Sequence, residues 1–217
     1  MGDPVRILLV RHGETEWNRL HRFQGRSDVP LNAEGMAQAH ALAAAVKGEP
    51  LVALYSSPLA RALQTARIIH AFHAGVPLVV EEDFAEMDLG AFDGMQAHQW
   101  AEENPEFLRI WQEDPARVRM PGGETLEEVQ ARALRTLDRI CLDHHPGDCL
   151  LISGHNFLNL TLLCHAMEIP LARFRSLRQG TAALNRLMKQ GDRLWVEILD
   201  DRSHLQDRAG GSRPAGA

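Results

Sequence analysis

Three short apolar runs, each leading into a cationic or imidazole side chain, constrain the fold of this chain most strongly. The runs are residues 5–10, 51–55 and 148–153. The side chains that follow them are Arg11, His12, Arg61 and His155. Nearly continuous apolar runs of this length are typical of strands buried on both faces of a parallel sheet. Because ligands of open α/β sheets bind outside the carboxyl ends of the strands, we expect these four side chains to meet at one point.

Helix signals between the runs indicate a β-α-β alternation and therefore a doubly wound α/β sheet. Asn32 is a predicted N-cap of a helix that extends to about Lys47. Ser57 is predicted to cap a second helix that begins at Pro58. The capping box of Thr125 and Glu128 opens a long third helix. A weaker strand is expected at residues 76–80, and residues 182–188 and 193–199 are expected to form a closing antiparallel hairpin.

The 217 residues fit one α/β domain, which we place at residues 1–207. Residues 81–123 mix acids, aromatics and prolines, with two short helices expected near 96–103 and 105–113. This pattern predicts a lid-like insertion that selects the substrate. The tail, residues 208–217, is rich in Gly, Ser, Pro and Ala and is predicted to be disordered.

Composition excludes several classes of function. The net charge of −6 is opposite in sign to that of a typical protein that follows a nucleic-acid backbone. No apolar run reaches the roughly 18 to 20 residues that a membrane span needs. The three cysteines are odd in number and lack metal-ligand spacing, which favours reduced thiols. Together with the lack of a secretory signal at the N-terminus, this predicts a cytoplasmic protein without nucleic-acid or membrane partners.

The residue types at the strand ends suit the transfer of a phosphoryl group. Arg11 and Arg61 offer planar forks of donors that match phosphate oxygens. A neutral imidazole can carry a phosphoryl group covalently, and we expect His12 to be that nucleophile. His155 would donate to the transferring oxygens. The leaving alcohol needs a proton, which the segment 84–90 could supply from Glu86 or from Asp88.

The chain resembles the histidine phosphatase superfamily, the phosphoglycerate mutase-like proteins, over about residues 5–200. The matching blocks are Arg11-His12-Gly13-Glu14-Thr15 with Asn18; Gln24-Gly25, Asp28 and Pro30-Leu31; Ser56-Ser57-Pro58-Leu59 with Arg61-Ala62; Glu86 to Gly90 with Asp93-Gly94; Pro121-Gly122-Gly123-Glu124-Thr125; and Gly154-His155. The resemblance departs at Asn156-Phe157, where relatives usually carry small residues. It implies a three-layer αβα sandwich with a mainly parallel central sheet and a lid-like insertion.

The resemblance also implies the roles of the site residues. His12 would be the phosphohistidine, Glu86 the acid, and Arg11, Arg61 and His155 the phosphate pocket. Asn18, Gln24 and Gly25 would bind the substrate or its phosphoryl oxygens. The expected activity is that of a phosphomonoesterase for a small phosphorylated metabolite, with no metal or other cofactor. The resemblance allows a homodimer.

Two other functions stay open at this point. One is a cofactor-dependent phosphoglycerate mutase, which returns the phosphoryl group to an intermediate. The other is a non-catalytic protein of the same fold that binds a phosphorylated ligand. Within the insertion, three arginines could bind a second anionic group of the substrate or could be ordinary solvated charges. They are Arg109, Arg117 and Arg119.

Overall fold

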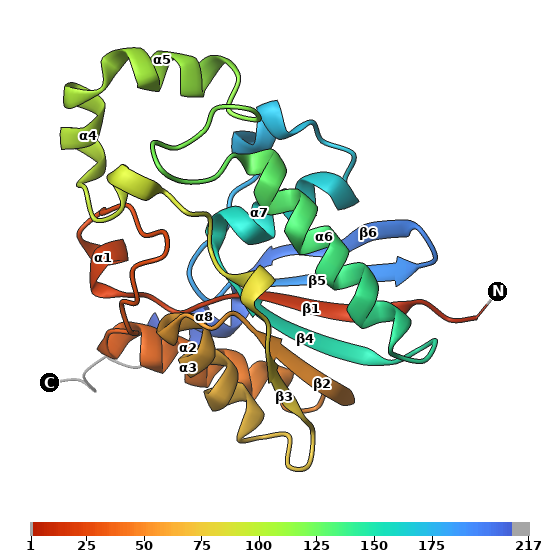
Figure 1. Ribbon diagram of the computed structural model, residues 1–217. Helices are drawn as coiled ribbons and strands as arrows, with labels where there is room; N and C mark the ends of the chain where they lie inside the picture. Colours follow the sequence, from red (N-terminus) through yellow and green to blue (C-terminus); the bar gives the residue numbers. More distant parts are fainter. Residues whose placement is uncertain (1, 210–217) are drawn as a thin grey trace, which may run out of the picture.

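The computed structural model describes residues 2–209, and a six-stranded mixed sheet runs through their centre (Figure 1). The strand order is β3-β2-β4-β1-β5-β6. The strands are β1 (Val5–Arg11), β2 (Leu51–Ser56), β3 (Leu78–Val80), β4 (Cys149–Gly154), β5 (Leu184–Gln190) and β6 (Arg193–Asp201). Strands β3, β2, β4 and β1 are parallel, and β5 and β6 complete the sheet as an antiparallel hairpin. The predicted α/β fold with a mainly parallel sheet is confirmed.

Helices cover both faces of this sheet, which gives three layers (Figure 1). One face carries α2 (Ala33–Val46), α3 (Ala60–His70) and α8 (Ser203–Ala209), and the other carries α6 (Leu126–Leu142) and α7 (Asn156–Ala166). Strand β1 serves both layers because its side chains alternate. Ile7 and Leu9 join the core under α6 and α7, whereas Leu8 and Val10 pack with apolar residues of α2.

The helix boundaries follow local capping chemistry at two of the three predicted sites. Asn32 Oδ1 accepts a hydrogen bond from the backbone N–H of Gly35 at 2.7 Å, and the capping box of Thr125 and Glu128 is present in full. The prediction for Ser57 is wrong: α3 begins at Ala60 with Leu59 as its N-cap. Ser57 Oγ instead lies at the end of β2 and accepts from the backbone N–H of Leu59 at 3.2 Å.

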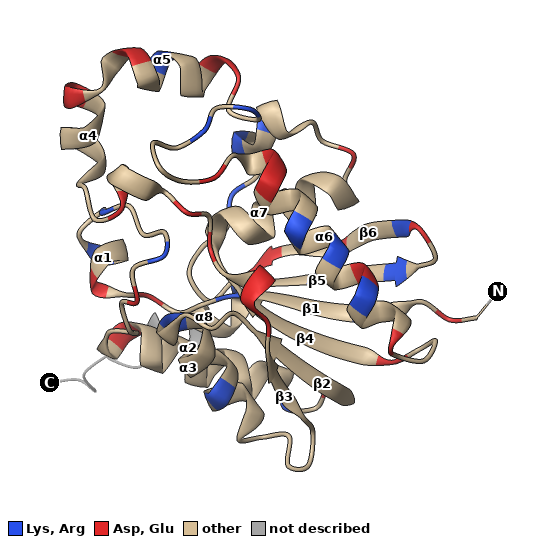
Figure 2. Ribbon diagram, in the orientation of Figure 1, with Lys and Arg blue, Asp and Glu red and all other residues tan. Residues whose placement is uncertain are grey.

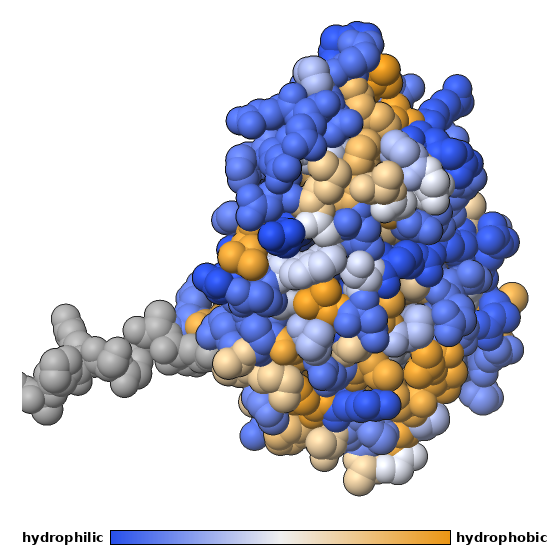
Figure 3. Space-filling model, turned by 60° about the vertical axis from the view of Figure 1, so that its left-hand side comes forward, coloured by the Kyte–Doolittle hydropathy of each residue, from blue (hydrophilic) through white to orange (hydrophobic). Residues whose placement is uncertain are grey.

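The segment that was expected as an insertion lies beyond the carboxyl ends of the strands (Figure 1). It contains α4 (Ala97–Glu103) and α5 (Pro105–Glu113), close to the predicted ranges, and two single 3₁₀ turns, η1 (Glu82–Phe84) and η2 (Gly90–Phe92). Short elements elsewhere are α1 (Glu16–Arg19) and η3 (Leu171–Ser176). On the face shown in Figure 3, the upper part of the molecule carries a band of moderately hydrophobic residues flanked by hydrophilic ones.

The expectation of a disordered tail from residue 208 is corrected at its start. Helix α8, which the sequence did not predict, extends through Ala209 and packs against α2. The rest of that predicted tail, residues 210–217, lies outside the described residues. Within residues 2–209, no helix is both long and apolar enough to cross a membrane. All three cysteines are unpaired, as predicted, and Cys149 and Cys164 are buried.

Candidate active site

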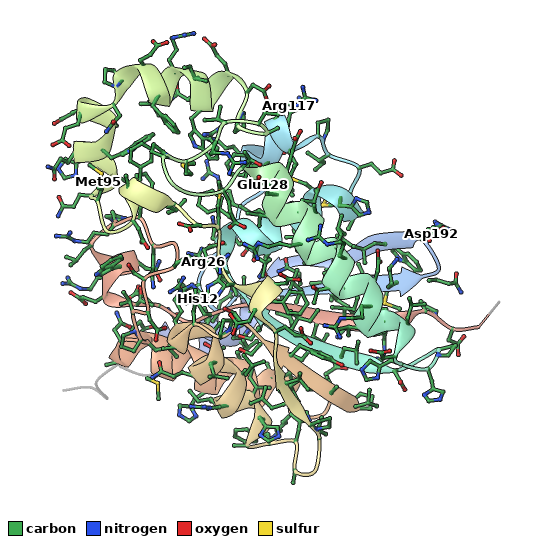
Figure 4. All side chains as sticks on the ribbon, in the orientation of Figure 1. His12, Arg26, Met95, Arg117, Glu128 and Asp192 are labelled. Atoms are coloured by element: carbon green, nitrogen blue, oxygen red, sulfur yellow. The ribbon has the colours of Figure 1, made fainter. Side chains whose placement is uncertain are left out.

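The carboxyl ends of β1, β2 and β4 bring the predicted side chains together. Arg11 at the end of β1 pairs in register with Gly154 at the end of β4, so His12 and His155 follow neighbouring strands. Their rings are 5.2 Å apart between centroids at an angle of 61°. Figure 4 shows His12 near the centre of the molecule, at the strand ends. Both histidines and Arg61 are buried, with exposed fractions of 3% or less.

The backbone fixes which nitrogen of His12 carries the proton. Nδ1 lies 2.7 Å from the carbonyl oxygen of Gly13, and because a carbonyl can only accept, Nδ1 is the donor. In a neutral ring, the lone pair is therefore on Nε2. Gly13 is required here, since a Cβ at this position would lie 2.3 Å from the carbonyl oxygen of Gly35.

The surroundings of His12 keep its imidazole neutral. Burial lowers its pKa well below the usual value, and the charges of Arg61 and Arg11 lower it further, whereas the bond to Gly13 acts in the opposite direction. A neutral imidazole with a free nitrogen is the form that can attack phosphorus. The surroundings of His12 therefore favour the form that its predicted role as nucleophile requires.

Arg61 ties His155 to the loop after α1. Its Nε donates to His155 Nδ1 at 3.2 Å, and its two terminal nitrogens donate to the carbonyl oxygens of Ser27 and Gly25, each at 2.8 Å. Asp93 anchors the same loop by accepting from the backbone N–H groups of Gly25 (2.9 Å) and Ser27 (2.8 Å). Burial lowers the pKa of Arg61 to about 10, so the guanidinium stays charged at neutral pH.

His155 is a neutral imidazole of the opposite tautomer to His12. Because Nδ1 accepts from Arg61, the proton is on Nε2, which lies 2.7 Å from Ser57 Oγ and donates to it. Burial lowers the pKa of His155 well below its usual value, and the charge of Arg61 lowers it further. Donation from His155 to a phosphoryl oxygen stays a prediction, and it requires that the Nε2 proton be shared with or released from Ser57.

The guanidinium of Arg11 has an N–H group that forms no hydrogen bond with the described residues. Its Nη1 donates to the backbone carbonyl of Gln179 at 2.6 Å, while its Nε is buried and meets no acceptor among the described residues. Burial lowers the pKa of Arg11, and the opposing effect of the carboxylates of Glu86 and Asp200 is smaller, so the pKa is lowered overall. A buried donor without an acceptor fits a site that binds phosphate oxygens.

Glu86 lies at the amino terminus of α7. Its Oε1 accepts from the backbone N–H groups of Met87 (2.9 Å) and Leu158 (3.1 Å), and its Oε2 accepts from that of Phe157 (3.1 Å). Leu158 and Phe157 belong to the first turn of α7, whose N-cap is His155. The sequence did not reveal this contact between Glu86 and the amino-terminal end of α7, where unpaired N–H groups are available. Glu86 is 3% exposed and acts electrostatically on both Arg11 and Arg61.

Of the three predicted substrate-binding residues, Asn18 lies in α1, whereas Gln24 and Gly25 lie on the loop that follows it. Asn18 completes the capping box of α1 through Oδ1, which accepts from the backbone N–H of Thr15 at 3.1 Å. The Gln24 amide, in its better orientation, accepts from Arg61 and donates to Thr15 Oγ1. Gly25 has both backbone groups engaged, with Asp93 and Arg61. Their contact with a substrate stays a prediction.

The three arginines of the insertion are paired with glutamates at the surface. Arg109 forms ion pairs with Glu106 and Glu113 of α5, Arg117 with Glu127, and Arg119 with Glu128. Figure 2 shows that α5 carries both basic and acidic residues. Figure 4 shows Arg117 far from His12. These contacts favour the alternative of solvated charge over a second anion site.

Sequence reasoning missed four residues that support the site: Ser57, Asp93, Arg132 and Gln179. Ser57 and Asp93 stand inside the blocks that carry the family resemblance, so that pattern could have indicated them. Arg132 and Gln179 have no local signal, because their bonds to the site join residues far apart in the sequence. The departure at Phe157 also has a structural consequence: its ring packs against Trp111 of α5, 6.4 Å between centroids.

Comparison with known proteins agrees with this geometry. The model of the histidine phosphatase superfamily, branch 1, matches residues 7–202. Phosphoserine phosphatase 1 of Hydrogenobacter thermophilus is 31% identical over 93% of this chain and 94% of its own length. Phosphoglycerate mutase-like protein 4 of Arabidopsis thaliana is 31% identical over 99% and 95%. The solved structure of Bacillus stearothermophilus YhfR has a TM-score of 0.86 at 29% identity, covering 93% of this chain and all of that one. The chain is therefore an enzyme of the histidine phosphatase superfamily, branch 1.

Proposed function

We propose that this enzyme is a metal-independent phosphomonoesterase that hydrolyses a small phosphorylated metabolite through a phosphohistidine on His12. The observation that carries the proposal is the state of His12: a buried neutral ring whose Nδ1 is fixed by Gly13 and whose Nε2 has a free lone pair. Two guanidinium groups beside it supply the positive charge that a phosphoryl dianion needs.

In the first step, Nε2 of His12 attacks phosphorus and the bond to the alcohol oxygen breaks. Arg11 and Arg61 hold the transferring oxygens, and Glu86, in its protonated form, gives its proton to the leaving alcohol. A bound phosphoryl dianion brings negative charge close to the Glu86 carboxylate and so favours that protonated form.

In the second step, water attacks the phosphohistidine. Glu86 is now a carboxylate and takes one proton from the water as the new P–O bond forms. The P–N bond breaks, its electron pair returns to Nε2 of His12, and inorganic phosphate leaves. The enzyme regains its starting state with no other reactant consumed.

The first experiment measures phosphate release from a panel of phosphomonoesters in excess chelator. The panel contains phosphoserine, 3-phosphoglycerate, sugar phosphates and α-ribazole phosphate. His12→Ala should abolish release, and His145→Ala is the matched control because that side chain is 93% exposed. Full activity of His12→Ala would refute the phosphohistidine.

The substrate class rests on the relatives. The name of the Hydrogenobacter protein points to phosphoserine, so we place a phosphorylated hydroxy acid first among the candidates. The name of the Arabidopsis relative keeps the mutase alternative open. Conversion of 3-phosphoglycerate in the presence of a catalytic bisphosphoglycerate, without phosphate release, would favour the mutase. Ligand binding without turnover of any panel member would favour a non-catalytic binding protein.

Two further parts of the proposal concern the setting of the enzyme. Unpaired cysteines, two of them buried, are compatible with the reducing cytoplasm. A homodimer stays a prediction, which sedimentation at two protein concentrations would test.

A further inference from the structure

Arg132 lies on α6, away from the strand ends, yet it is one of the few buried charged side chains of the protein. All five of its N–H donors have acceptors. Nε donates to Glu124 Oε1 (2.9 Å), Nη1 to the carbonyl oxygens of Asp83 (2.5 Å) and Ala85 (2.7 Å), and Nη2 to Glu124 Oε2 (3.1 Å) and the carbonyl oxygen of Glu86 (3.1 Å). Such complete use of a guanidinium indicates a fixed geometry.

We propose that Arg132 is a positioning residue for the acid Glu86: it clamps the backbone that carries this carboxyl group, at three carbonyl groups on one side and through Glu124 on the other. The inference rests on the proposed function, because it takes Glu86 as the group that protonates the leaving alcohol.

The segment around Glu86 needs such a clamp because it has no strand partner. Residues 85–89 connect two single 3₁₀ turns, η1 and η2, and form no ladder of the sheet. Helix α6 supplies hydrogen-bond donors to this stretch of backbone. Arg132 donates to the carbonyl oxygens of Asp83, Ala85 and Glu86, and Thr136 Oγ1 donates to Asp83 Oδ2 at 3.0 Å. The backbone before and at Glu86 is thus held by one helix.

Glu124 extends the clamp to the other side of Glu86. Its Oε2 accepts from Arg132 and also from the backbone N–H of Asp88 at 2.8 Å. Burial raises the pKa of Glu124, but the bonds from Arg132 and Asp88 and the charges of Arg132 and Arg26 outweigh it and lower the pKa. Glu124 therefore stays a carboxylate and completes the ionic link between α6 and the residues on both sides of the acid.

Two helices therefore hold Glu86, one at its backbone and the other at its side chain. Arg132 of α6 holds the carbonyl of Glu86, while the first turn of α7 holds its carboxylate oxygens. A shift of the backbone by 1 Å would move the carboxyl group relative to the alcohol oxygen that it must protonate, which is the scale on which catalysis is lost.

The test compares two substrates whose leaving groups differ in their need for a proton. An alkyl alcohol such as that of phosphoserine leaves as a neutral alcohol and needs the acid, whereas p-nitrophenolate leaves as a stable anion. Arg132→Lys keeps the charge but offers three donors for five acceptors. We compare kcat/KM, which reports the first step alone, because the second step uses Glu86 with both substrates. We expect kcat/KM for phosphoserine, or for the best alkyl substrate of the panel, to fall by about 10- to 100-fold, and kcat/KM for p-nitrophenyl phosphate to fall by less than about threefold.

Matched variants separate the possible outcomes. Glu86→Gln should show the same larger loss for the alkyl substrate than for p-nitrophenyl phosphate, and Glu124→Gln should show a smaller difference between the two substrates. Arg135→Lys, an exposed arginine on the same helix, should show none. If Glu86→Gln loses more activity with the alkyl substrate than with p-nitrophenyl phosphate and Arg132→Lys does not, the inference about Arg132 is overturned, whereas Glu86 remains the proposed acid. If Glu86→Gln itself affects both substrates equally, the assignment of Glu86 as the acid fails, and the positioning role of Arg132 fails with it.

A second readout does not depend on turnover. The backbone amides of Met87, Phe157 and Leu158 donate to the Glu86 carboxylate, so displacement of Glu86 should speed their hydrogen exchange in Arg132→Lys but not in Arg135→Lys. Unchanged exchange at these amides would contradict a positioning role. A uniform increase over the whole chain would do so as well, because it would indicate general destabilisation.

Discussion

Acidification should destabilise this protein through its two buried active-site histidines. His12 and His155 are neutral in the folded protein, with pKa values held well below the usual value by burial and by neighbouring guanidinium charges. In the unfolded chain each imidazole titrates near pH 6.5. The unfolded state therefore binds more protons below that pH, so stability is full above about pH 6.5 and is lost as the pH falls through 6.5 toward the folded pKa.

The size of the effect follows from the linkage relation. At pH 5.5 an unfolded imidazole is about 90% protonated while the folded one is still neutral, which costs about 1.4 kcal/mol per histidine. Two histidines give about 2.8 kcal/mol, a substantial share of the roughly 5–15 kcal/mol by which a domain is stable. The loss between pH 7.5 and 5.5 should therefore be easy to measure.

The assay is urea unfolding at a series of pH values between 7.5 and 5.5. Carboxylates also titrate in acid, so the test is the difference in slope between the wild type and His155→Gln or His12→Gln. Each substitution should remove about half of the histidine contribution, that is about 1.4 kcal/mol over this range. His145→Gln should leave the slope unchanged because that side chain is exposed. Parallel curves for all four proteins would refute the reasoning that the two site histidines are buried in neutral form.

Two further predictions concern the supports of the site. Ser57→Ala removes the acceptor of the His155 Nε2 proton and should lower the free energy of unfolding by about 1–3 kcal/mol in urea titrations. Asp93→Asn weakens the anchor of the loop that holds Arg61, and steady-state kinetics should show KM for the phosphorylated substrate raised by about tenfold.

Local signals were sufficient for much of the fold. Asn32 and the pair Thr125–Glu128 were predicted as caps, and they are caps, because these bonds join residues three apart in the sequence. The buried strands were visible as apolar runs because both faces of the sheet are covered by helices. The strand ends then followed from sheet topology, which is why Arg11, His12 and His155 could be expected at one edge.

The errors occurred where long-range contacts outweigh local preference. Ser57 has the sequence context of an N-cap, but its hydroxyl is used by His155, 98 residues away in the sequence. Arg132 reads as an ordinary helical arginine, and only the fold shows that it binds the backbone at Glu86, 46 residues earlier. A supporting residue such as Arg132 has a weak signal in the sequence because three of its acceptors are backbone carbonyls that no motif records.

The position of Glu86 connects the electrostatics of the free site to its chemistry. The same helix end supplies His155 as its N-cap and two amide donors for the Glu86 carboxylate, so one turn of α7 sets the position of both groups. The side chain of Glu86 acts electrostatically on Arg11 and Arg61, and the amide groups of α7 hold it in place. A phosphoryl dianion competes with Glu86 for this positive field.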